Sequence, residues 1–183
     1  LVLQRMEFIV LASSKLGKAW GETGNTYGVL GSDLFTEEYK QLSNSGIVAL
    51  DFNKGGASFD TYAMPCRQFG LLGTSIFGNN GVTPIPPRGK QLFDLRAGLV
   101  QACPLTNVIF SGGEVLKEDV LEYGRYFSVN GLLIDTGKDE KELLLHFMSN
   151  AYSDKAQDDY HNFTSTVAWC LSRLNEDKGL SSA

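Results

Sequence analysis

One segment constrains the fold most, because it has the pattern of a β-hairpin. Two runs rich in β-forming residues, 75–77 and 82–85, flank the turn sequence Gly78-Asn79-Asn80-Gly81. Asn and Gly tolerate the positive φ angles that tight hairpin turns require. Helices are predicted on both sides of it, over 58–69 and over 88–100. This part of the chain is therefore expected to form a helix–hairpin–helix unit.

The other elements follow from hydrophobic spacing and turn residues. The apolar run 7–12 is expected to form a buried strand, and the Gly-rich stretch 13–31 is expected to form a long loop. Asp33 or Thr36 is the expected N-cap of a helix that ends at Gly46. The remaining predictions are a strand over 47–52 and helices over 113–127, 138–152 and 157–174. The predicted fold class is therefore α+β and helix-rich.

The composition is that of a packed globular protein. Hydrophobic residues make up 43% and charged residues 20% of the 183 positions, which differs from disordered and membrane-spanning chains. Glu7 interrupts the first apolar run, which argues against a secretory signal peptide. We therefore expect a soluble, cytoplasmic protein. Because the sequence starts at Leu1 and not at Met, we expect it to be processed, trimmed or part of a longer chain.

The formal net charge of −5 is unevenly distributed along the chain. Residues 1–105 contain nine Lys/Arg and eight Asp/Glu, whereas residues 106–183 contain seven and thirteen. With a boundary near Pro104, the chain is predicted to form a domain over 1–105 and an acidic helical domain over 106–183. The acidic helices are expected to bind a protein partner and not DNA, while the nearly neutral first half can meet an anion locally.

Two phrases around the predicted hairpin carry a resemblance to a known domain. Before it stands Arg67-Gln68-Phe69-Gly70-Leu71-Leu72, and after it Thr83-Pro84-Ile85-Pro86-Pro87-Arg88-Gly89-Lys90-Gln91-Leu92. They resemble the winged-helix family, in which a helix ends in R-x-x-G-L-L/I and the second wing strand leads through L-T-x-x-G-x-x-L into a helix. The resemblance covers about 40 residues. The spacing after Thr83 is longer than in the family, and Pro65 lies within the first helix, where proline is unfavourable.

The resemblance implies a surface that meets DNA. Such a surface needs hydrogen-bond donors at base edges and cations at phosphates. The candidate DNA-binding residues are Lys54, Tyr62, Arg67, Gln68, Asn79, Asn80, Arg88 and Lys90. These include few cations, and phosphate contacts supply most of the non-specific affinity for DNA. A role in packing or protein interaction is therefore the favoured alternative.

The same order of parts, followed by acidic amphipathic helices, is also similar to uncharacterised prokaryotic proteins associated with restriction or phage defence. This wider resemblance implies a role in antiviral defence. The predicted function is a non-enzymatic winged-helix interaction module, acting as a subunit of a larger assembly. DNA association and protein association both remain open for it.

The alternative prediction is an enzyme whose small-molecule site lies in the Gly-rich loop 13–31. Trp20, Glu22, Asn25 and Tyr27 would line that site. However, the sequence shows no P-loop, no G-x-S-x-G motif and no identifiable catalytic residue. The three cysteines, Cys66, Cys103 and Cys170, are too widely spaced for a zinc site and are expected to be reduced thiols. No metal or cofactor is expected, and a non-enzymatic role is preferred.

Overall fold

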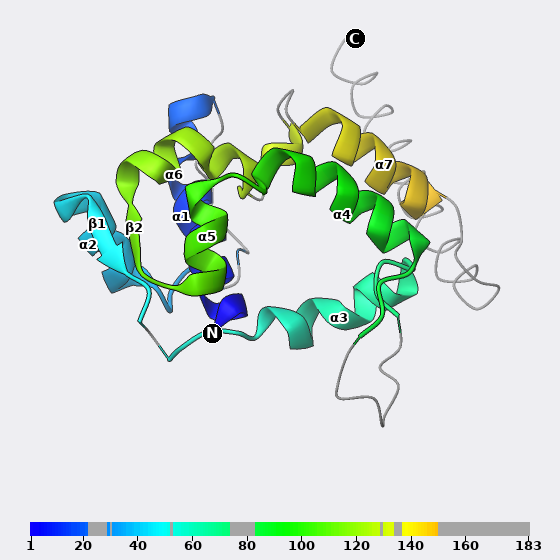
Figure 1. The fold of residues 1–183 in the computed structure, drawn as a ribbon, viewed down its shortest axis with the longest axis horizontal. Coiled ribbons are helices and arrows are strands. Elements are labelled where there is room, and N and C mark those ends of the chain that lie inside the picture. The colour runs from blue at the N-terminus through cyan, green and yellow to red at the C-terminus, as the bar shows by residue number, and fades with distance from the viewer. Residues whose placement is uncertain are drawn as a thin grey trace, which may run out of the picture.

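The computed structural model describes residues 1–21, 29, 31–51, 53–73, 83–128, 130–133 and 137–149. These residues form a helix-rich α+β fold, which confirms the predicted class (Figure 1). The predicted helix over 157–174 and most of the predicted hairpin, residues 74–82, lie outside the described residues. Residues 83–85, predicted to belong to its second strand, have no regular secondary structure. The described elements are α1 (Val2–Leu16), η1 (Gly17–Trp20), α2 (Thr36–Ser45), β1 (Ile47–Ala49), α3 (Ser58–Gln68), α4 (Pro87–Val100), α5 (Pro104–Ser111), β2 (Glu114–Leu116), α6 (Lys117–Tyr123), η2 (Gly124–Tyr126), η3 (Gly131–Leu133) and α7 (Lys138–Ser149).

The predicted N-terminal strand over 7–12 is wrong, because these residues belong to helix α1. Phe8, Ile9, Leu11 and Ala12 are all fully buried in the core. Helix α1 packs against α5, α6 and η2, and the five residues 8–12 near its middle are all apolar. A short apolar run of this kind does not distinguish a buried strand from a buried helix.

The predicted loop also starts later than expected. Ser13 and Ser14 are buried in the last turns of α1, where the Ser14 hydroxyl donates to the carbonyl of Val10 at 2.8 Å. This back-bond lets a serine remain within a helix. Residues 17–20 then form the 3₁₀ helix η1.

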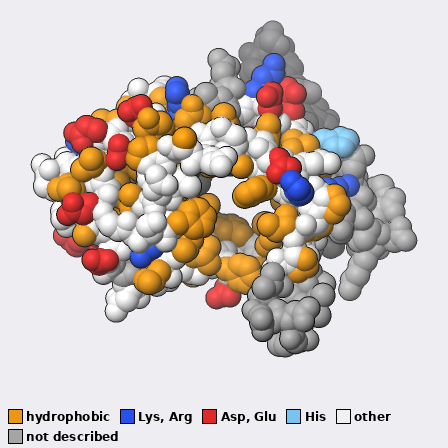
Figure 2. Space-filling model, in the orientation of Figure 1, with side chains coloured by type: hydrophobic (Ala, Val, Ile, Leu, Met, Phe, Trp, Pro, Cys, Tyr) orange, Lys and Arg blue, Asp and Glu red, His pale blue; other side chains and the backbone are white. Residues whose placement is uncertain are grey.

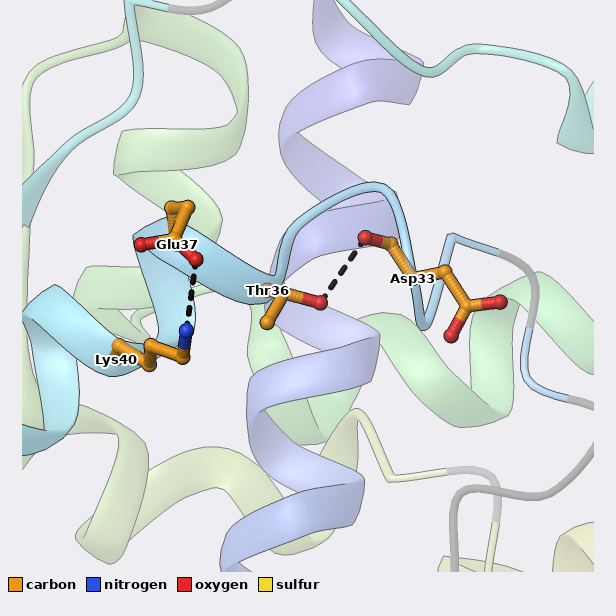
Figure 3. Close-up of polar contacts among 4 residues, drawn as sticks. All are labelled: Asp33, Thr36, Glu37 and Lys40. Atoms are coloured by element: carbon orange, nitrogen blue, oxygen red, sulfur yellow. Dashed lines mark hydrogen bonds and ion pairs between the residues drawn. The ribbon is translucent and has the colours of Figure 1, made fainter.

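Helix α2 begins and ends close to the predicted positions. It starts at Thr36, and Gly46 ends it in the left-handed conformation with φ +78°. The Thr36 hydroxyl does not cap the helix; it donates to the carbonyl of Asp33 at 3.0 Å, in the turn that precedes α2 (Figure 3). Lys40 binds Glu37 at 2.8 Å on the exposed side of the first turn, and this contact lowers the pKa of the Glu37 carboxyl.

The small sheet joins distant parts of the chain. β1 pairs antiparallel with β2, with Ile47 opposite Leu116 and Val48 opposite Val115. The predicted helix over 113–127 is therefore wrong at its start, since Val115 is buried and its two neighbours are exposed, as in a strand. The strand pairing crosses the expected boundary near Pro104. Residues from both sides of that boundary, including Phe8, Leu42 and Leu105, share one hydrophobic core.

Two charged side chains of α1 hold the ends of other helices. The buried Glu7 carboxylate accepts the backbone N–H of Gly56 at 2.6 Å and of Ser58 at 2.7 Å, where α3 begins. Arg5 donates to the carbonyls of Ile109 and Phe110, at 3.3 and 3.2 Å, near the end of α5. Each charge has the sign that the helix dipole favours at that end. Glu7 thus caps the start of α3 from another helix.

Four contacts close a ring of helices (Figure 1), and the ring surrounds a hollow in the space-filling view (Figure 2). Glu7 joins α1 to the start of α3. At the other end of α3, Gly89 of α4 lies so close to the carbonyl of Leu71 that a Cβ there would overlap it. Arg96 of α4 donates to the carbonyl of Tyr126 in η2 at 2.7 Å, and η2 packs on α1. We call α1, α3, α4 and η2 the ring, and the space within it the central opening.

Removing the Glu7 carboxylate should destabilise the protein. Glu7→Ala leaves two buried backbone N–H groups without an acceptor, and we expect the free energy of unfolding to fall by about 2 kcal/mol. Glu7→Gln keeps one acceptor oxygen and should lose about half as much. Urea unfolding followed by circular dichroism measures both. Glu37→Gln on the exposed side of α2 is the matched control and should leave the unfolding midpoint unchanged.

Gly55→Ala should be more harmful than a comparable change at Gly46. Both glycines have positive φ, +91° and +78°, but a Cβ at Gly55 would lie 2.7 Å from the Glu7 Oε2 atom and 2.8 Å from the Phe35 ring. Around Gly46 no atom lies within 4 Å of that position. We expect a loss of about 1 kcal/mol for Gly46→Ala from backbone strain, and of more than about 2 kcal/mol for Gly55→Ala. Equal losses in thermal unfolding would show that Gly55 does not pack against Glu7.

Candidate functional site: the central opening

The predicted DNA-binding cation Arg88 has its guanidinium bound within the fold. Arg88, at the start of α4, is half-buried and lies over the ring of Phe147, 5.2 Å from its centroid. Its Nη1 atom donates to the carbonyls of Phe69 and Phe147, at 3.5 and 3.2 Å. These carbonyls lie at the C-terminal ends of α3 and α7, where a cation is favourable. Arg88 therefore binds two helix ends together.

The other predicted cations also have partners within the chain. Lys54 pairs with Glu38 at 2.7 Å, and Lys90 pairs with Asp94 at 2.6 Å. The Nε atom of Arg67 donates to the carbonyl of Gly73 at 3.2 Å. The structure brings Arg67 and Arg88 near the corner between α3 and α4, while Lys54 lies before the start of α3. Of the uncharged candidates, Tyr62 and Gln68 are exposed on α3, and Asn79 and Asn80 lie outside the described residues.

The two ends of the predicted hairpin meet at its base. The backbone N–H of Gly73 donates to the carbonyl of Pro84 at 2.8 Å. A Cβ at Gly73 would lie 2.6 Å from the Pro84 side chain, so this close approach requires glycine. Closely paired ends are what a hairpin over this segment requires, although residues 74–82 between them are not described.

The central opening has a mostly hydrophobic border. Figure 2 shows hydrophobic side chains gathered around the hollow that lies between α3, α4 and α5. Exposed large hydrophobic side chains on these three helices are Phe59, Tyr62, Met64, Phe93, Leu99 and Phe110. Exposed aromatic residues on helices that border one hollow are unusual for a free surface and are typical of an interaction site.

Phe93 illustrates why these side chains remain exposed. On α4 it lies on the same side as Gly89 and Val100, at helical spacings of four and seven residues. Gly89 is buried against the end of α3, and Val100 packs against the core. Between these two contacts the ring is open, and Phe93 is 60% exposed. Its exposure is therefore a consequence of the ring geometry.

Phe110 lies on the side of α5 that the core does not use. Leu105 and Ile109 of α5 are buried in the core, whereas Phe110 is 67% exposed. On α3, Phe59 and Tyr62 are 42% and 48% exposed. Sequence reasoning identified Tyr62, but not Phe93 or Phe110 as site residues. Phe93 could have been found in the sequence, because it lies off the apolar stripe that Leu92, Leu95 and Leu99 form on the same helix.

The opening is held on its α4 side by Arg96. This guanidinium bonds the Tyr126 carbonyl, forms an ion pair with Glu140 of α7, and is largely shielded from water. Burial lowers the pKa of Arg96. Because the same side chain links α4, α7 and η2, it fixes the position of the helix that carries Phe93.

An acidic group lies on α6, which packs against α5. It consists of Glu118, Asp119 and Glu122. Partial burial and repulsion from Glu122 and Glu118 raise the pKa of the Asp119 carboxyl. These carboxylates belong to the chain segment predicted to be acidic, and none of them forms an ion pair with another described residue.

The described residues give little support to the alternative prediction of an enzyme. Glu22, Asn25 and Tyr27 lie outside them, and Trp20 is half-buried at the end of η1. Among the described residues no group of three or more His, Cys, Asp or Glu side chains is placed to hold a metal ion. Cys66 is half-buried and Cys103 buried, and burial raises the pKa of both thiols. None of the described helices is long and apolar enough to cross a membrane.

Comparison with protein-family models, curated proteins and solved structures found no match. The geometry of the chain itself is therefore the basis for assigning a function.

Arg88→Gln should lower stability, because the guanidinium supports the ends of two helices. We expect the free energy of unfolding to fall by about 1–3 kcal/mol, as for a hydrogen-bonded charge. Lys90→Gln is the matched control in the same helical turn; its exposed ion pair contributes less than about 0.5 kcal/mol. Chemical unfolding measures both variants. Unchanged stability of Arg88→Gln together with lost DNA binding would instead favour the DNA-binding role.

Proposed function

We propose that this chain is a non-enzymatic interaction module of a larger assembly, and that a partner protein docks at the central opening. The observation that carries the proposal is the hydrophobic border of that opening (Figure 2), together with the exposed aromatic side chains that α3, α4 and α5 carry. Aromatic residues that become buried at the centre of a protein interface commonly supply most of its binding energy.

The side chains of Phe93 and Phe110 leave most of their apolar area in water, which costs about 25 cal/mol for each Å². Covering such area recovers this free energy, and rigid aromatic side chains lose little conformational freedom on binding. The ring holds both residues on helices, so the surface is formed before a partner arrives.

The winged-helix resemblance is part of this proposal. In it, α3, the connection over 69–86 and α4 form a winged-helix-like unit that serves as a docking element. The bonded ends of the connection, Gly73 and Pro84, support that view. The intramolecular partners of Lys54, Arg67, Arg88 and Lys90 support protein over DNA as the direct ligand. In the proposal, DNA association and a role in restriction or phage defence belong to the whole assembly.

Substitution at the opening should remove the partner without unfolding the chain. Phe93→Gln and Phe110→Gln alter exposed side chains, so thermal unfolding should change little. The tagged full chain, expressed in cells of its source, should lose at least about fivefold of its co-purifying partner with either variant. Leu121→Gln, which alters an exposed apolar residue on α6 away from the opening, is the matched control and should retain it.

Two results would contradict the proposal. One is equal recovery of the same partner with the wild-type chain and with both phenylalanine variants. The other is tight binding of a labelled DNA duplex by the isolated chain, with affinity that falls steeply as salt increases.

A further inference from the structure

Helix α3 crosses one side of the ring and buries little of its own surface (Figure 1). Of its eleven residues, all of them described, Ala63 alone is buried. The large side chains of Phe59, Tyr62 and Met64 are exposed. Most of the stability of a helix in a protein comes from tertiary packing, and an isolated helix of this length is only marginally stable in water. Packing therefore does little to keep α3 folded and in place.

Pro65 weakens α3 from within. It lies in the second half of the helix, and it has no backbone N–H to donate to the carbonyl of Thr61 one turn earlier. Its ring also crowds that carbonyl, which makes proline the least favourable residue for a helix interior. Helix α3 is therefore less stable than its length alone would make it.

The N-terminal end of α3 is held by polar contacts from α1. The Glu7 carboxylate accepts the backbone N–H groups of Gly56 and Ser58. The Gln4 side chain adds only a long hydrogen bond, 3.5 Å, to the carbonyl of Gly55. The chain turns here through Gly55 and Gly56, with φ of +91° and +93°. Because glycine adopts other backbone conformations at little cost, this segment can rearrange when the contacts to Glu7 break.

The C-terminal end of α3 is attached to α4. Arg88 of α4 donates to the carbonyl of Phe69, and Gly89 packs against the carbonyl of Leu71. Arg96 fixes α4 in turn to η2 and α7, so α4 does not depend on α3 for its position. Loss of the Glu7 contacts would therefore open the ring between α1 and α3 and leave the core and α4 packed.

We propose that α3 is a detachable strap, which releases Glu7 and opens one side of the ring while the core stays folded. Segments that bury little apolar surface open locally at a lower free energy than the core around them. The released strap gives a partner sideways access to the central opening. This role in access rests on the proposed function, whereas the detachment of α3 is a property of this chain alone.

Native-state hydrogen exchange of the full chain, read by mass spectrometry at a series of low urea concentrations, tests the strap. The backbone amides of α3 should be protected at least about thirtyfold less than those of α1. Exchange of the α3 amides should change little with urea, because local opening exposes little new surface. Exchange of the α1 amides should rise steeply with urea, because it requires the core to unfold.

A core variant separates local opening from unfolding of the whole protein. Ile109 is buried in the core on α5, and Ile109→Val should speed exchange of the α1 amides by about threefold while exchange of the α3 amides stays the same. Glu7→Gln weakens the attachment of α3 itself and should speed exchange of the α3 amides by about fivefold.

Pro65→Ala should act in the opposite direction. It supplies an N–H group for the carbonyl of Thr61 and should slow exchange of the α3 amides by at least about tenfold. Pro87→Ala is the matched control. Pro87 lies at the start of α4, where proline fits a helix, so its replacement should leave exchange of the α3 amides unchanged.

Two results would overturn the strap. One is equal protection of α3 and α1, with Ile109→Val speeding both to the same degree, because α3 would then open only when the whole protein unfolds. The other is exchange of the α3 amides that Pro65→Ala does not slow. Neither result depends on a partner, and recovery of a partner by the Phe93 and Phe110 variants does not depend on exchange, so this inference and the proposed function fail separately.

Discussion

The buried carboxylate of Glu7 is the interaction on which the rest of the architecture depends. It lies in the middle of α1, the helix around which the core is built, and it binds the backbone N–H groups of Gly56 and Ser58. Without it, α3 would have no firm attachment to the core at its N-terminal end. The neighbouring Arg5 binds the end of α5 by the complementary interaction. One helix therefore positions two others through opposite charges.

The ring arrangement leaves the aromatic side chains of α3, α4 and α5 exposed to water. α3 contacts the rest of the protein near its two ends, through Glu7 and through Gly89. Between those contacts, several large side chains on α3 and α4 remain exposed, among them Tyr62 and Phe93. A compact bundle would have buried Phe93 against another helix. The ring leaves it in water, where it is available to a partner.

The cations show how strongly tertiary context changes the meaning of a sequence. Arg67, Arg88 and Lys90 follow a plausible pattern for a DNA-binding surface, and their number alone already weakened that interpretation. In the structure they stabilise helix ends or pair with nearby acids. A guanidinium that binds two carbonyls within the fold is poorly placed to leave them for phosphate, since those carbonyls would lose their donors.

The elements that could be predicted from the sequence are those with a local sequence pattern, such as a cap or a helical period. The spacing of apolar residues and the glycine at position 46 predicted α2, α4 and α7 closely, because caps and helical periodicity depend on near neighbours. The helical conformation of residues 7–12 could not be predicted from the sequence, because a run of consecutive apolar residues has neither the period of an amphipathic helix nor that of a half-buried strand. Only the tertiary structure decided that Glu7 caps α3 and that Phe93 and Phe110 stay exposed. These features depend on contacts between residues far apart in the chain, for which no local pattern exists.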